Sequence, residues 1–505
     1  MKPCKGGTDC SVVFVGEKAP LPFAKPKMTK VKSPSARRFA RVALICLAAL
    51  LSVERIRAEA MPAPKRDWRD EIVYVIVIQK WFNGNRANDY MLDRFGAVKN
   101  QYEGGLWGGD LDGIIQKLDY LSSLGVTALL LYPVVANDRM PFGKYLPTGY
   151  RPRDYFQVDE NFGSLETLKR LVDGAHQRHM RVILDLPLGF PGAEHPYLQD
   201  PSKKDWFGEM TAYGVRQWDT DNPDVADYLI KISRFWKDES HCDGFRLDSS
   251  HLHSMEFWKR YARELKGAAH DKDFFLLAEV PLSPAKIGEF IKATGFDSAY
   301  DFSAGIAREV FGKAANVDRI SAVLREGKDL YPTPSRLCAQ LDEYEDPEFI
   351  TSAKKPKEAR MKMAMTYLLT LNRIPLLYSG DEVAASYREV GGVFTPERQS
   401  SPFLEYTRRL VALRKREKVL RSGDLVEAQS RNPIYAYLRA QGDDRILVIF
   451  NTSAEARSIS FPLGPLRWAD CGLIDLLSAQ TVKTKADAGQ MQIEPFSARV
   501  LRVFH

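Results

Sequence analysis

Eight short apolar runs that alternate with helical stretches constrain the fold of this chain more than any other feature. Each run has four to seven residues, most of them Val, Ile, Leu or aromatic. Strands that alternate with helices indicate a parallel sheet, and eight such units indicate a (β/α)8 barrel of the α/β class. An open doubly wound sheet is compatible with the same alternation. The runs are Ile72–Ile78, Val126–Tyr132, Val182–Leu186, Gly244–Asp248, Phe274–Glu279, Ala299–Phe302, Leu337–Leu341 and Ile374–Tyr378.

Two of the intervening segments have the apolar period of an amphipathic helix. The segment from Ser164 to His179 carries apolar residues three and four positions apart. The segment from Asp110 to Leu124 does the same and is followed by Gly125, which is a helix stop signal. Both segments lie between predicted strands, as a barrel requires.

The character of the sequence changes after Arg416. Short runs of strand type are joined by turns such as Gly442-Asp443, and the helical period is weak. We therefore predict a catalytic barrel over residues 61–416 and an antiparallel β-sandwich over 417–505. The strand-like runs are Ile434–Leu438, Ile446–Asn451, Ala456–Phe461 and Ala498–Val503.

Residues 1–60 have the pattern of a targeting leader. A basic stretch, Lys25–Arg41, precedes the apolar run Val42–Val53, and Ala58-Glu59-Ala60 follows as an A-x-A cleavage pattern. Met28 is a candidate for the true first residue. We expect a signal peptide that is cleaved near Ala60, a secreted or periplasmic protein, and no stable membrane insertion after processing, because the run is short for a span. The alternative is a protein anchored through an uncleaved leader.

Charge and cysteine content exclude some classes of function. Residues 1–60 hold 12 of the 72 Lys and Arg and 4 of the 65 Asp and Glu. The remainder is near neutral, so no nucleic-acid partner is implied. Outside the leader, Cys242, Cys338 and Cys471 are far apart and form no metal-binding or disulfide pattern, which favours buried free thiols.

Acidic residues end several of the predicted strands. Asp185, Asp248 and Glu279 close the third, fourth and fifth runs, and Asp342 and Asp346 follow the seventh. Catalytic side chains of such a barrel stand at the C-terminal ends of its strands. A carboxylate at the end of an apolar strand is otherwise costly, so several of them together indicate a site.

Paired carboxylates suit glycoside hydrolysis, in which one attacks the anomeric carbon and the other protonates the leaving oxygen. Arg246 lies two residues before Asp248, so both side chains share one strand face. Its charge favours an ionised Asp248. Glu279 has no basic residue within three positions, which suits a general acid. The alternative for Arg246 and Asp248 is a purely structural ion pair.

From about residue 70 to 505, the chain resembles the α-amylase family, glycoside hydrolase family 13. In its general sequence pattern it is most similar to the neopullulanase and cyclomaltodextrinase members. Gly244-Phe245-Arg246-Leu247-Asp248 resembles the nucleophile strand and Ala278-Glu279-Val280 the acid strand. Further matching segments are Val182–Leu186, Gly109–Ile114, Gly149-Tyr150, Asp221-Asn222-Pro223 and Ile374–Tyr378, in the family's order.

The resemblance implies a role for each matching residue. Asp248 corresponds to the nucleophile and Glu279 to the acid/base, with Arg246 beside them. Tyr150 is expected to stack on the sugar at the cleavage point. Asp185 is expected to contact Arg246 or the substrate.

A third catalytic Asp is also implied, and two positions compete for it. Aligned on Asp346, the family's downstream Pro and Phe correspond to Pro347 and Phe349. The family's pattern is an aromatic residue, two further residues and then Asn-His-Asp. Aligned on Asp342, this pattern begins at Leu337. We favour Asp346 and keep Asp342 as the alternative.

Several family histidines are absent. Gly189-Phe190 stands where the family has Asn-His, and His251-Leu252 where it has Lys-His. Phe190 and His251 are therefore the substrate-binding candidates at these positions, while His253 or His195 are further substitutes. The lost histidines normally hydrogen-bond the sugar, so their loss is expected to weaken transition-state stabilisation. The lost Asn is a family calcium ligand, and the lobe inserted around 189–217 is short.

A second cation site is indicated after the first strand. Calcium binds six to eight oxygen ligands from a turn of this kind, and the pattern resembles the N-terminal calcium loop of the neopullulanase-like members. The alternative is an Asn- and Gly-rich turn that binds nothing. The candidate ligands are Asn83, Asn85, Asn88, Asp89, Gly108 and Asp110.

These observations predict a retaining α-glucan glycosidase that acts on α-1,4 bonds, with α-1,6 bonds as a second candidate linkage. The expected partner is an oligo- or polysaccharide, and no organic cofactor is expected. The alternatives are a transglycosylase of the same family and a catalytically weakened glucan-binding or scaffold protein. A barrel aldolase or isomerase would need a Schiff-base lysine or a phosphate loop at a strand end, and neither is found.

Overall fold

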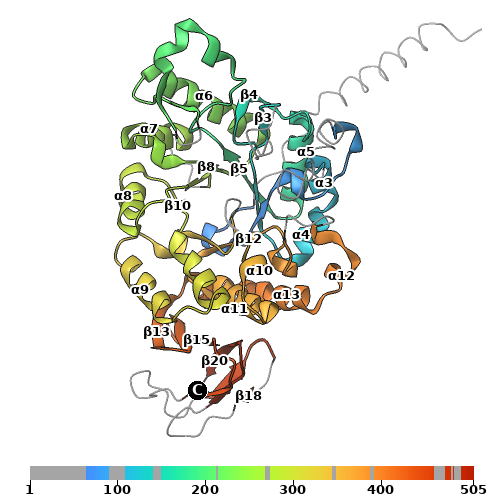
Figure 1. Ribbon diagram of the computed structural model, residues 1–505, viewed down its shortest axis with the longest axis vertical. Coiled ribbons are helices and arrows are strands. Elements are labelled where there is room, and N and C mark those ends of the chain that lie inside the picture. The colour runs from blue at the N-terminus through green and yellow to red at the C-terminus, as the bar shows by residue number, and fades with distance from the viewer. Residues whose placement is uncertain are drawn as a thin grey trace, which may run out of the picture. The chain divides into compact units, whose positions relative to one another are not determined.

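Eight parallel strands form one sheet in the order β10-β9-β8-β5-β2-β1-β12-β11 (Figure 1). A parallel bridge between Tyr300 and Cys338 joins its two ends, so the sheet closes on itself. Each predicted run overlaps one strand, although the sixth run shares only Ala299 with its strand, and this confirms the (β/α)8 barrel and excludes the open sheet. The strands are β1 (Val73–Ile76), β2 (Ala128–Leu131), β5 (Arg181–Leu186), β8 (Gly244–Leu247), β9 (Phe275–Ala278), β10 (Ser298–Ala299), β11 (Cys338–Gln340) and β12 (Ile374–Tyr378).

This computed structural model describes residues 64–89, 108–139, 149–211, 214–267, 273–343, 348–386, 392–459, 472–478, 481–482 and 491–504. The predicted leader lies outside these residues. Within them, no helix has both the length and the apolar character needed to cross a membrane.

The barrel strands are nearly continuous apolar runs because both of their faces are buried. Val73 and Val75 of β1 belong to the core inside the barrel, whereas Tyr74 and Ile76 pack outward against the helices. This is the side-chain alternation of a strand with two covered faces. It explains why the eight runs could be recognised but showed no polar face.

The predicted helices are present, with one interruption. α5 (Leu165–Gln177) begins after Ser164, whose side chain accepts a hydrogen bond from the Thr167 amide. The predicted helix from Asp110 to Leu124 is divided at Lys117 into α3 (Leu111–Gln116) and α4 (Leu118–Leu124). Gly125 ends α4 with a φ of 94°, as its stop signal predicts.

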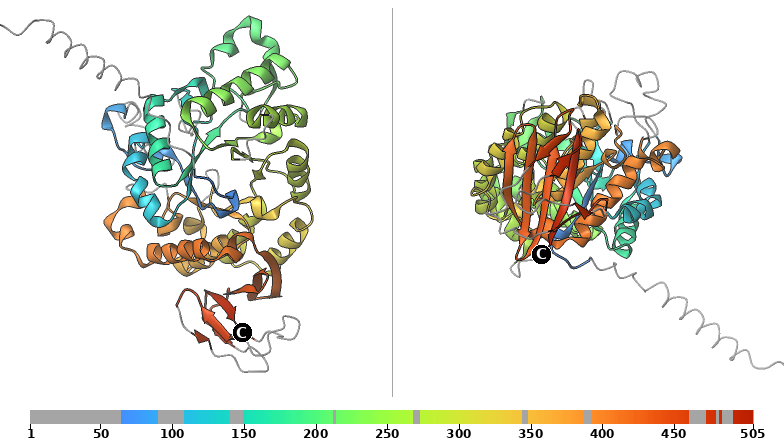
Figure 2. Two further views of the ribbon diagram at one scale, coloured as in Figure 1. Left: turned by 180° about the vertical axis from the view of Figure 1, so that it is seen from behind. Right: turned by 90° about the horizontal axis from the view of Figure 1, so that it is seen from below.

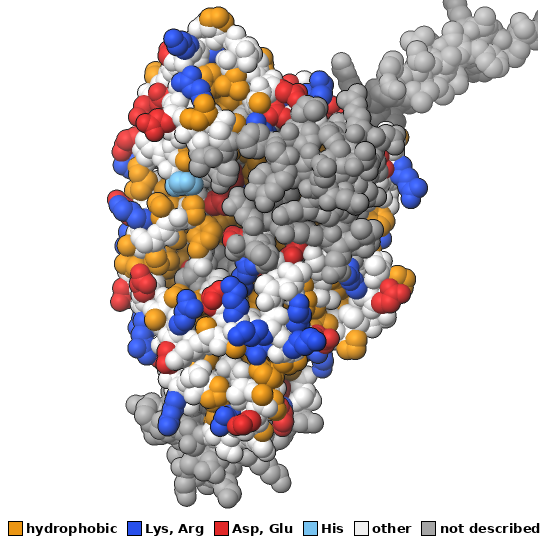
Figure 3. All heavy atoms as spheres, viewed as in Figure 1, with side chains coloured by type: hydrophobic (Ala, Val, Ile, Leu, Met, Phe, Trp, Pro, Cys, Tyr) orange, Lys and Arg blue, Asp and Glu red, His pale blue; other side chains and the backbone are white. Residues whose placement is uncertain are grey.

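The other helices surround the barrel in the views of Figure 2. They are α6 (Pro223–Ser240), α7 (Met255–Lys266), α8 (Pro284–Thr294), α9 (Asp318–Gly327), α10 (Phe349–Ser352), α11 (Lys357–Thr370), α12 (Pro396–Gln399), α13 (Pro402–Arg416) and α14 (Lys418–Ser422). Two small antiparallel ribbons lie in the connections after β2 and β5: β3 (Val135–Asn137) with β4 (Pro152–Val158), and β6 (Phe207–Met210) with β7 (Arg216–Trp218). On the face in Figure 3, acidic and basic side chains are intermingled.

The C-terminal part forms a six-stranded antiparallel sheet in the order β13-β14-β15-β20-β17-β18, and a ribbon of β16 and β19. Leu447 of the sheet and Ile459 and Ile493 of the ribbon belong to one buried core, so the two layers form the predicted sandwich. The strands are β13 (Asp424–Arg431), β14 (Ile434–Gln441), β15 (Asp444–Asn451), β16 (Arg457–Ile459), β17 (Gly472–Asp475), β18 (Thr481–Val482), β19 (Met491–Ile493) and β20 (Ser497–Phe504).

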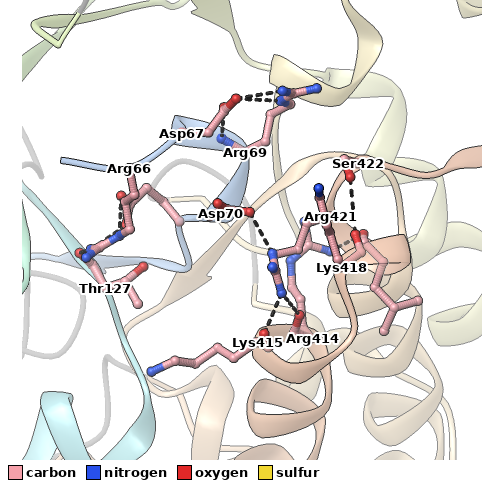
Figure 4. A network of polar contacts seen from close by, with 12 residues as sticks. Arg66, Asp67, Arg69, Asp70, Thr127, Arg414, Lys415, Lys418, Arg421 and Ser422 are labelled. Atoms are coloured by element: carbon pink, nitrogen blue, oxygen red, sulfur yellow. Dashed lines mark hydrogen bonds and ion pairs between the residues drawn. The ribbon is translucent and has the colours of Figure 1, made fainter. Parts of the chain in front are cut away.

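Arginine side chains join this sheet and the preceding helix α14 to the barrel. Arg439 of β14 donates from Nη1 to the Leu420 carbonyl at 2.7 Å and also to that of Thr370 at the end of α11. Arg421 of α14 donates from Nε to Asp70 Oδ1 at 2.6 Å and from Nη1 to the Arg414 carbonyl at 2.9 Å (Figure 4). Asp70 belongs to the 3-10 helix η1 (Trp68–Asp70), so the first described segment is tied to the domain junction.

Two of the three cysteines outside the leader can be placed. Cys242 and Cys338 are buried free thiols, as predicted. Burial raises the pKa of each thiol to about 12, so both are poor nucleophiles at neutral pH. Cys471 lies outside the described residues.

Candidate active site

One guanidinium group joins three carboxylates at the C-terminal ends of adjacent strands. Arg246 Nη1 lies 2.7 Å from Asp248 Oδ1 and 3.0 Å from both carboxylate oxygens of Asp185. Its Nη2 lies 2.6 Å from Glu279 Oε1. The strand register explains this meeting, because Arg246 of β8 pairs with Asp185 of β5 and with Leu277 of β9.

Glu279 has no basic residue within three positions of the sequence, but it has one in the folded chain. Arg246 is distant in the sequence but contacts Glu279 across the β8–β9 boundary. Burial nevertheless raises the pKa of Glu279 to about 8, against the lowering effect of Arg246 and with a further rise from the Asp248 carboxylate. A raised pKa favours the protonated carboxyl at neutral pH, which is the state that a general acid needs.

The turn after β8 holds the other oxygen of Glu279. Ser249 has a φ of 50°, in the left-handed region that is costly for a residue with a Cβ atom. Its amide donates to Glu279 Oε2 at 2.9 Å, and the amide of Ser250 donates to the Glu279 carbonyl at 2.9 Å. Backbone strain of this kind is concentrated at functional sites.

Asp185 lies behind the two other carboxylates. Its side chain is fully buried, whereas those of Asp248 and Glu279 are 12% and 23% exposed. Tyr150 donates from its hydroxyl to Asp185 Oδ2 at 2.6 Å. Burial raises the pKa of Asp185 to about 7. The exposed fractions leave Asp248 and Glu279 as the acids that a substrate can reach.

Two tyrosine rings flank the guanidinium. Arg246 Cζ lies 5.8 Å from the ring centre of Tyr150 and 5.6 Å from that of Tyr300. These are cation–π distances. Tyr150 was expected near the site, but Tyr300 was not singled out. The available signal was its position directly after the sixth strand, where an aromatic residue points toward the barrel mouth.

The two candidates for the third Asp have different outcomes. Asp346 lies outside the described residues. Asp342 is buried, hydrogen-bonded to Asp381, and accepts the Phe349 amide at 2.7 Å. None of its described contacts is with Arg246, Asp248 or Glu279, so the structure assigns Asp342 to a buried carboxyl pair beside the site.

Most of the residues proposed to replace the family histidines are buried and make contacts away from the carboxylate cluster. His253 is buried with Nε2 2.9 Å from the Leu188 carbonyl, and His195 packs against aromatic rings. Burial lowers the pKa of each to about 4, so both are neutral. Phe190 is also buried. Only His251 of this group is exposed, on the 3-10 helix η7 (Ser250–Leu252).

The predicted cation loop brings several oxygen atoms together. Asn83 Nδ2 lies 2.8 Å from both carboxylate oxygens of Asp89. A Cβ atom at Gly108 would lie 2.4 Å from Asn83 Nδ2 and Asp89 Oδ1, so only glycine fits there. The side-chain oxygens of Asn83 and Asn88 are buried without a hydrogen-bond partner in the described chain. Orphaned buried oxygens are costly unless a ligand satisfies them.

Two further members of the ligand set behave as turn residues. Asp110 accepts the amides of Gly113 at 2.6 Å and Asn85 at 2.8 Å, and Asn85 Oδ1 accepts the Ala87 amide. In the described part of the chain, no group of three or more His, Cys, Asp or Glu is placed to hold a metal. A cation here would therefore depend on side-chain amide and backbone oxygens beside the Asp89 carboxylate, and calcium accepts all of these.

A closed (β/α)8 barrel with carboxylates gathered round an arginine at its strand ends is the architecture of a glycosidase. The chain matches the Alpha amylase, catalytic domain family over residues 76–216 and 200–390, and the Maltogenic Amylase, C-terminal domain family over 425–500. It belongs to the α-amylase family of glycoside hydrolases, as the resemblance predicted.

Individual relatives agree with this assignment. The chain is 27% identical to a cyclomaltodextrinase of Geobacillus thermopakistaniensis, over 87% of this chain and 78% of that protein. It is 26% identical to neopullulanase 2 of Thermoactinomyces vulgaris, over 88% and 79%. The crystal structure of an Anoxybacillus α-amylase superposes with a TM-score of 0.77 at 30% identity, covering 87% of this chain and 99% of that one. The α-amylase of Geobacillus thermoleovorans complexed with acarbose also gives 0.77 at 30% identity, over 87% and 100%.

Proposed function

We propose that this protein hydrolyses α-1,4-glucosidic bonds of α-glucans with retention of configuration. The observation that carries the proposal is the difference in surroundings between two neighbouring acids, Asp248 and Glu279. Arg246 Nη1 lies 2.7 Å from Asp248 Oδ1, whereas burial raises the pKa of Glu279 to about 8. An ionised nucleophile beside a protonated acid is the arrangement that a retaining glycosidase needs.

In the first step, an Asp248 carboxylate oxygen attacks the anomeric carbon and the bond to the leaving oxygen breaks. Glu279 gives its proton to that oxygen, so the first sugar product leaves neutral. In the second step, the Glu279 carboxylate takes a proton from water while the water oxygen attacks the anomeric carbon and releases Asp248. Glu279 is protonated again at the end of the cycle.

The purified full-length protein tests this proposal with maltooligosaccharides, cyclodextrins, starch and pullulan. NMR of the first product reports retention or inversion at the anomeric carbon. A slow-turnover glycosyl fluoride should leave a covalent sugar on Asp248, which peptide mass spectrometry locates. Both Asp248→Asn and Glu279→Gln should lose at least about 1,000-fold in kcat/KM. Inversion of configuration, or a label on another residue, would refute the mechanism.

A second candidate function is glucan binding with little turnover. It is favoured by the absence of the family histidines, because His253 and His195 are buried and hydrogen-bonded or packed elsewhere. In that case glucan should bind the wild type and Glu279→Gln equally, and neither should form product. A measurable rate that Glu279→Gln removes excludes this candidate. Transfer to an acceptor sugar in place of water would identify a transglycosylase.

Calcium in the Asn83–Asp89 loop is a further part of the proposal. The unpartnered oxygens of Asn83 and Asn88, the Asp89 carboxylate and the crowded position at Gly108, which admits only glycine, fit a cation that prefers oxygen ligands. The bound ion would order the loop after β1, and the steps above do not use it.

Export is also proposed from the leader pattern. Cleavage near Ala60 would release a mature protein that begins just before the described residues. N-terminal sequencing of the protein from the medium or periplasm tests this, and an intact leader in the membrane fraction would favour the anchored alternative.

A further inference from the structure

A tryptophan of the outer helical layer is hydrogen-bonded to the turn that contacts Glu279. Trp258 of α7 donates from Nε1 to the Ser250 carbonyl at 2.7 Å. Both residues are fully buried, and a buried indole N–H needs an acceptor. The bond therefore ties the peptide between Ser250 and His251 to α7.

The other polar groups of Ser250 are bonded to the strand ends. Its amide donates to the Glu279 carbonyl at 2.9 Å, and its hydroxyl donates to the Leu247 carbonyl at 2.9 Å. The amide directly before it, that of Ser249, donates to Glu279 Oε2 at 2.9 Å. Ser250 is thus held by β8, by the end of β9 and by α7, and the position of the Ser249 amide depends on it.

Backbone strain at Ser249 explains why the turn needs these bonds. A φ of 50° is costly for a residue with a Cβ atom, and such a conformation persists only where the surroundings over-determine it. Without the Trp258 bond, the Ser250 carbonyl would be buried and unpaired, and the turn could relax out of the left-handed region. A change of φ at Ser249 would turn its amide away from Glu279.

The position of the Trp258 indole is fixed by the core behind it. Its ring centre lies 5.2 Å from that of Tyr261, 5.5 Å from that of Phe296 and 6.5 Å from that of Phe290 on α8. These are ordinary distances for packed aromatic rings. The indole N–H therefore donates to the turn from a rigid support.

We propose that Trp258 is a positioning residue for the general acid, which holds the Ser250 carbonyl so that the Ser249 amide meets Glu279 Oε2. The inference rests on the proposed function, in which Glu279 gives its proton to the leaving oxygen. Trp258 acts through the turn and touches neither the substrate nor the reacting atoms.

Glu279 is affected by several groups at the strand ends. Burial raises its pKa to about 8, against the lowering effects of Arg246 and of the Ser249 amide. The charged and titratable groups that face it are Arg246, Asp248, Asp185 and Tyr300. A substitution at Trp258 changes none of these groups. Loss of the Ser249 amide should therefore raise the pKa of Glu279 further.

Trp258→Phe tests the proposal because it removes the N–H and keeps an aromatic ring in the core. On maltotetraose, kcat should fall by roughly 10- to 100-fold because the acid is misplaced. KM should change little, since Trp258 is fully buried. The alkaline limb of kcat/KM should move upward. The carbon-13 resonance of the Glu279 carboxyl, assigned by its loss in Glu279→Gln, should titrate at a higher pH than in the wild type.

Trp236→Phe is the matched control. Trp236 of α6 is also fully buried, and its Nε1 donates to the Tyr155 carbonyl on β4 at 2.8 Å. Both variants lose one buried indole hydrogen bond, so both should lower the melting temperature. Only Trp258→Phe should change kcat and the titration of Glu279. Wild-type kcat and titration in Trp258→Phe would overturn the proposal, as would equal changes in the two variants.

A second substitution keeps the test decisive if Trp258→Phe does not fold. β-(3-Benzothienyl)alanine in place of Trp258 has nearly the same shape and carries sulfur where the indole has its N–H. It should lower kcat and raise the pH at which the Glu279 carboxyl titrates. Wild-type values of both quantities would overturn the proposal.

The carboxyl titration needs no turnover, so it separates this inference from the proposed function. A higher pKa of Glu279 in Trp258→Phe but not in Trp236→Phe, in a protein that cleaves no glucan, would support the positioning role and refute hydrolysis. Hydrolysis by the wild type, with the same kcat and the same Glu279 titration in Trp258→Phe, would support hydrolysis and refute the positioning role.

Discussion

Arg246 Nη2 lies 2.6 Å from Glu279 Oε1, so the proposed general acid is in contact with the same guanidinium that holds the proposed nucleophile. The arginine thus positions both acids at once. A lysine ammonium, with one compact charge, cannot reproduce this fork.

Arg246→Lys should lower kcat/KM by about 100-fold or more, because it misplaces both carboxylates. The free energy of unfolding should fall by about 1–3 kcal/mol, since hydrogen bonds to buried charged groups are lost. Hydrolysis rates and thermal melts measure the two effects. Arg234→Lys is the control, because Arg234 pairs with Glu264 on the surface with 54% of its side chain exposed. Near-native activity of Arg246→Lys would show that the fork is dispensable.

The pH dependence of kcat/KM should have an alkaline limb near pH 8. Glu279 must be protonated to act as the acid, and burial raises its pKa to about 8. The rate should therefore be sustained through neutral pH and fall about tenfold per pH unit above 8. A rate profile on maltotriose between pH 5 and 10 measures it. An alkaline limb near pH 5 would mean that Arg246 dominates over burial.

Substitutions at Ser249 should distinguish the effect of its backbone strain from the role of its amide in positioning Glu279. Ser249→Gly removes the Cβ that disfavours a φ of 50° and should stabilise the protein by about 1 kcal/mol with activity retained. A β-branched residue resists this conformation, so Ser249→Val should displace the amide from Glu279 Oε2. Glu279 then loses a donor that lowers its pKa, and the alkaline limb should move upward. An unmoved limb in Ser249→Val would contradict the positioning role.

The Asp342–Asp381 pair should make the protein less stable as the pH rises. Burial raises the pKa of Asp342 to about 6 and that of Asp381 well above its ordinary value. Raised pKa values favour folding while the groups are protonated, at low pH, and this advantage is lost as the pH rises through about 6. Asp381→Asn imitates the protonated acid and should stabilise the protein by about 1–3 kcal/mol at pH 8. Denaturant unfolding at pH 5 and pH 8 measures the difference. Destabilisation by Asp381→Asn at pH 8 would contradict this account.

Calcium removal should lower the melting temperature. With free calcium at about 100-fold above Kd, binding contributes about 2.7 kcal/mol to stability, and EGTA should remove it reversibly. Asp89→Asn should abolish this response by removing the carboxylate beside Asn83. Asp221→Asn, which changes the same charge at an exposed position, should retain it. If calcium does not change the melting temperature of the wild type, the Asn83–Asp89 loop is a turn that binds no cation.

The barrel could be predicted because its signals are local. β12 (Ile374–Tyr378) coincides with its apolar run, and each of the other runs overlaps a strand, the sixth only at Ala299. The break at Lys117 between α3 and α4 was missed, since the apolar period continues through it. Arg246 and Asp248 could be paired because side chains two residues apart share a strand face.

Contacts between strands could not be predicted in this way. The meeting of Arg246 with Glu279 depends on the β8–β9 register, and that of Asp342 with Asp381 on the neighbouring ends of β11 and β12. The contact of Tyr300 with Arg246 likewise depends on strand packing, because Tyr300 follows β10 and Arg246 belongs to β8.

The amino-acid sequence alone thus determined the eight strands, the C-terminal sandwich, the family and two of the acids, because periodicity and motif spacing are properties of short segments. The tertiary structure decided which groups share the Arg246 guanidinium and which acids are buried as a pair. Those outcomes depend on register and burial, which arise only when distant strands pack into one closed barrel.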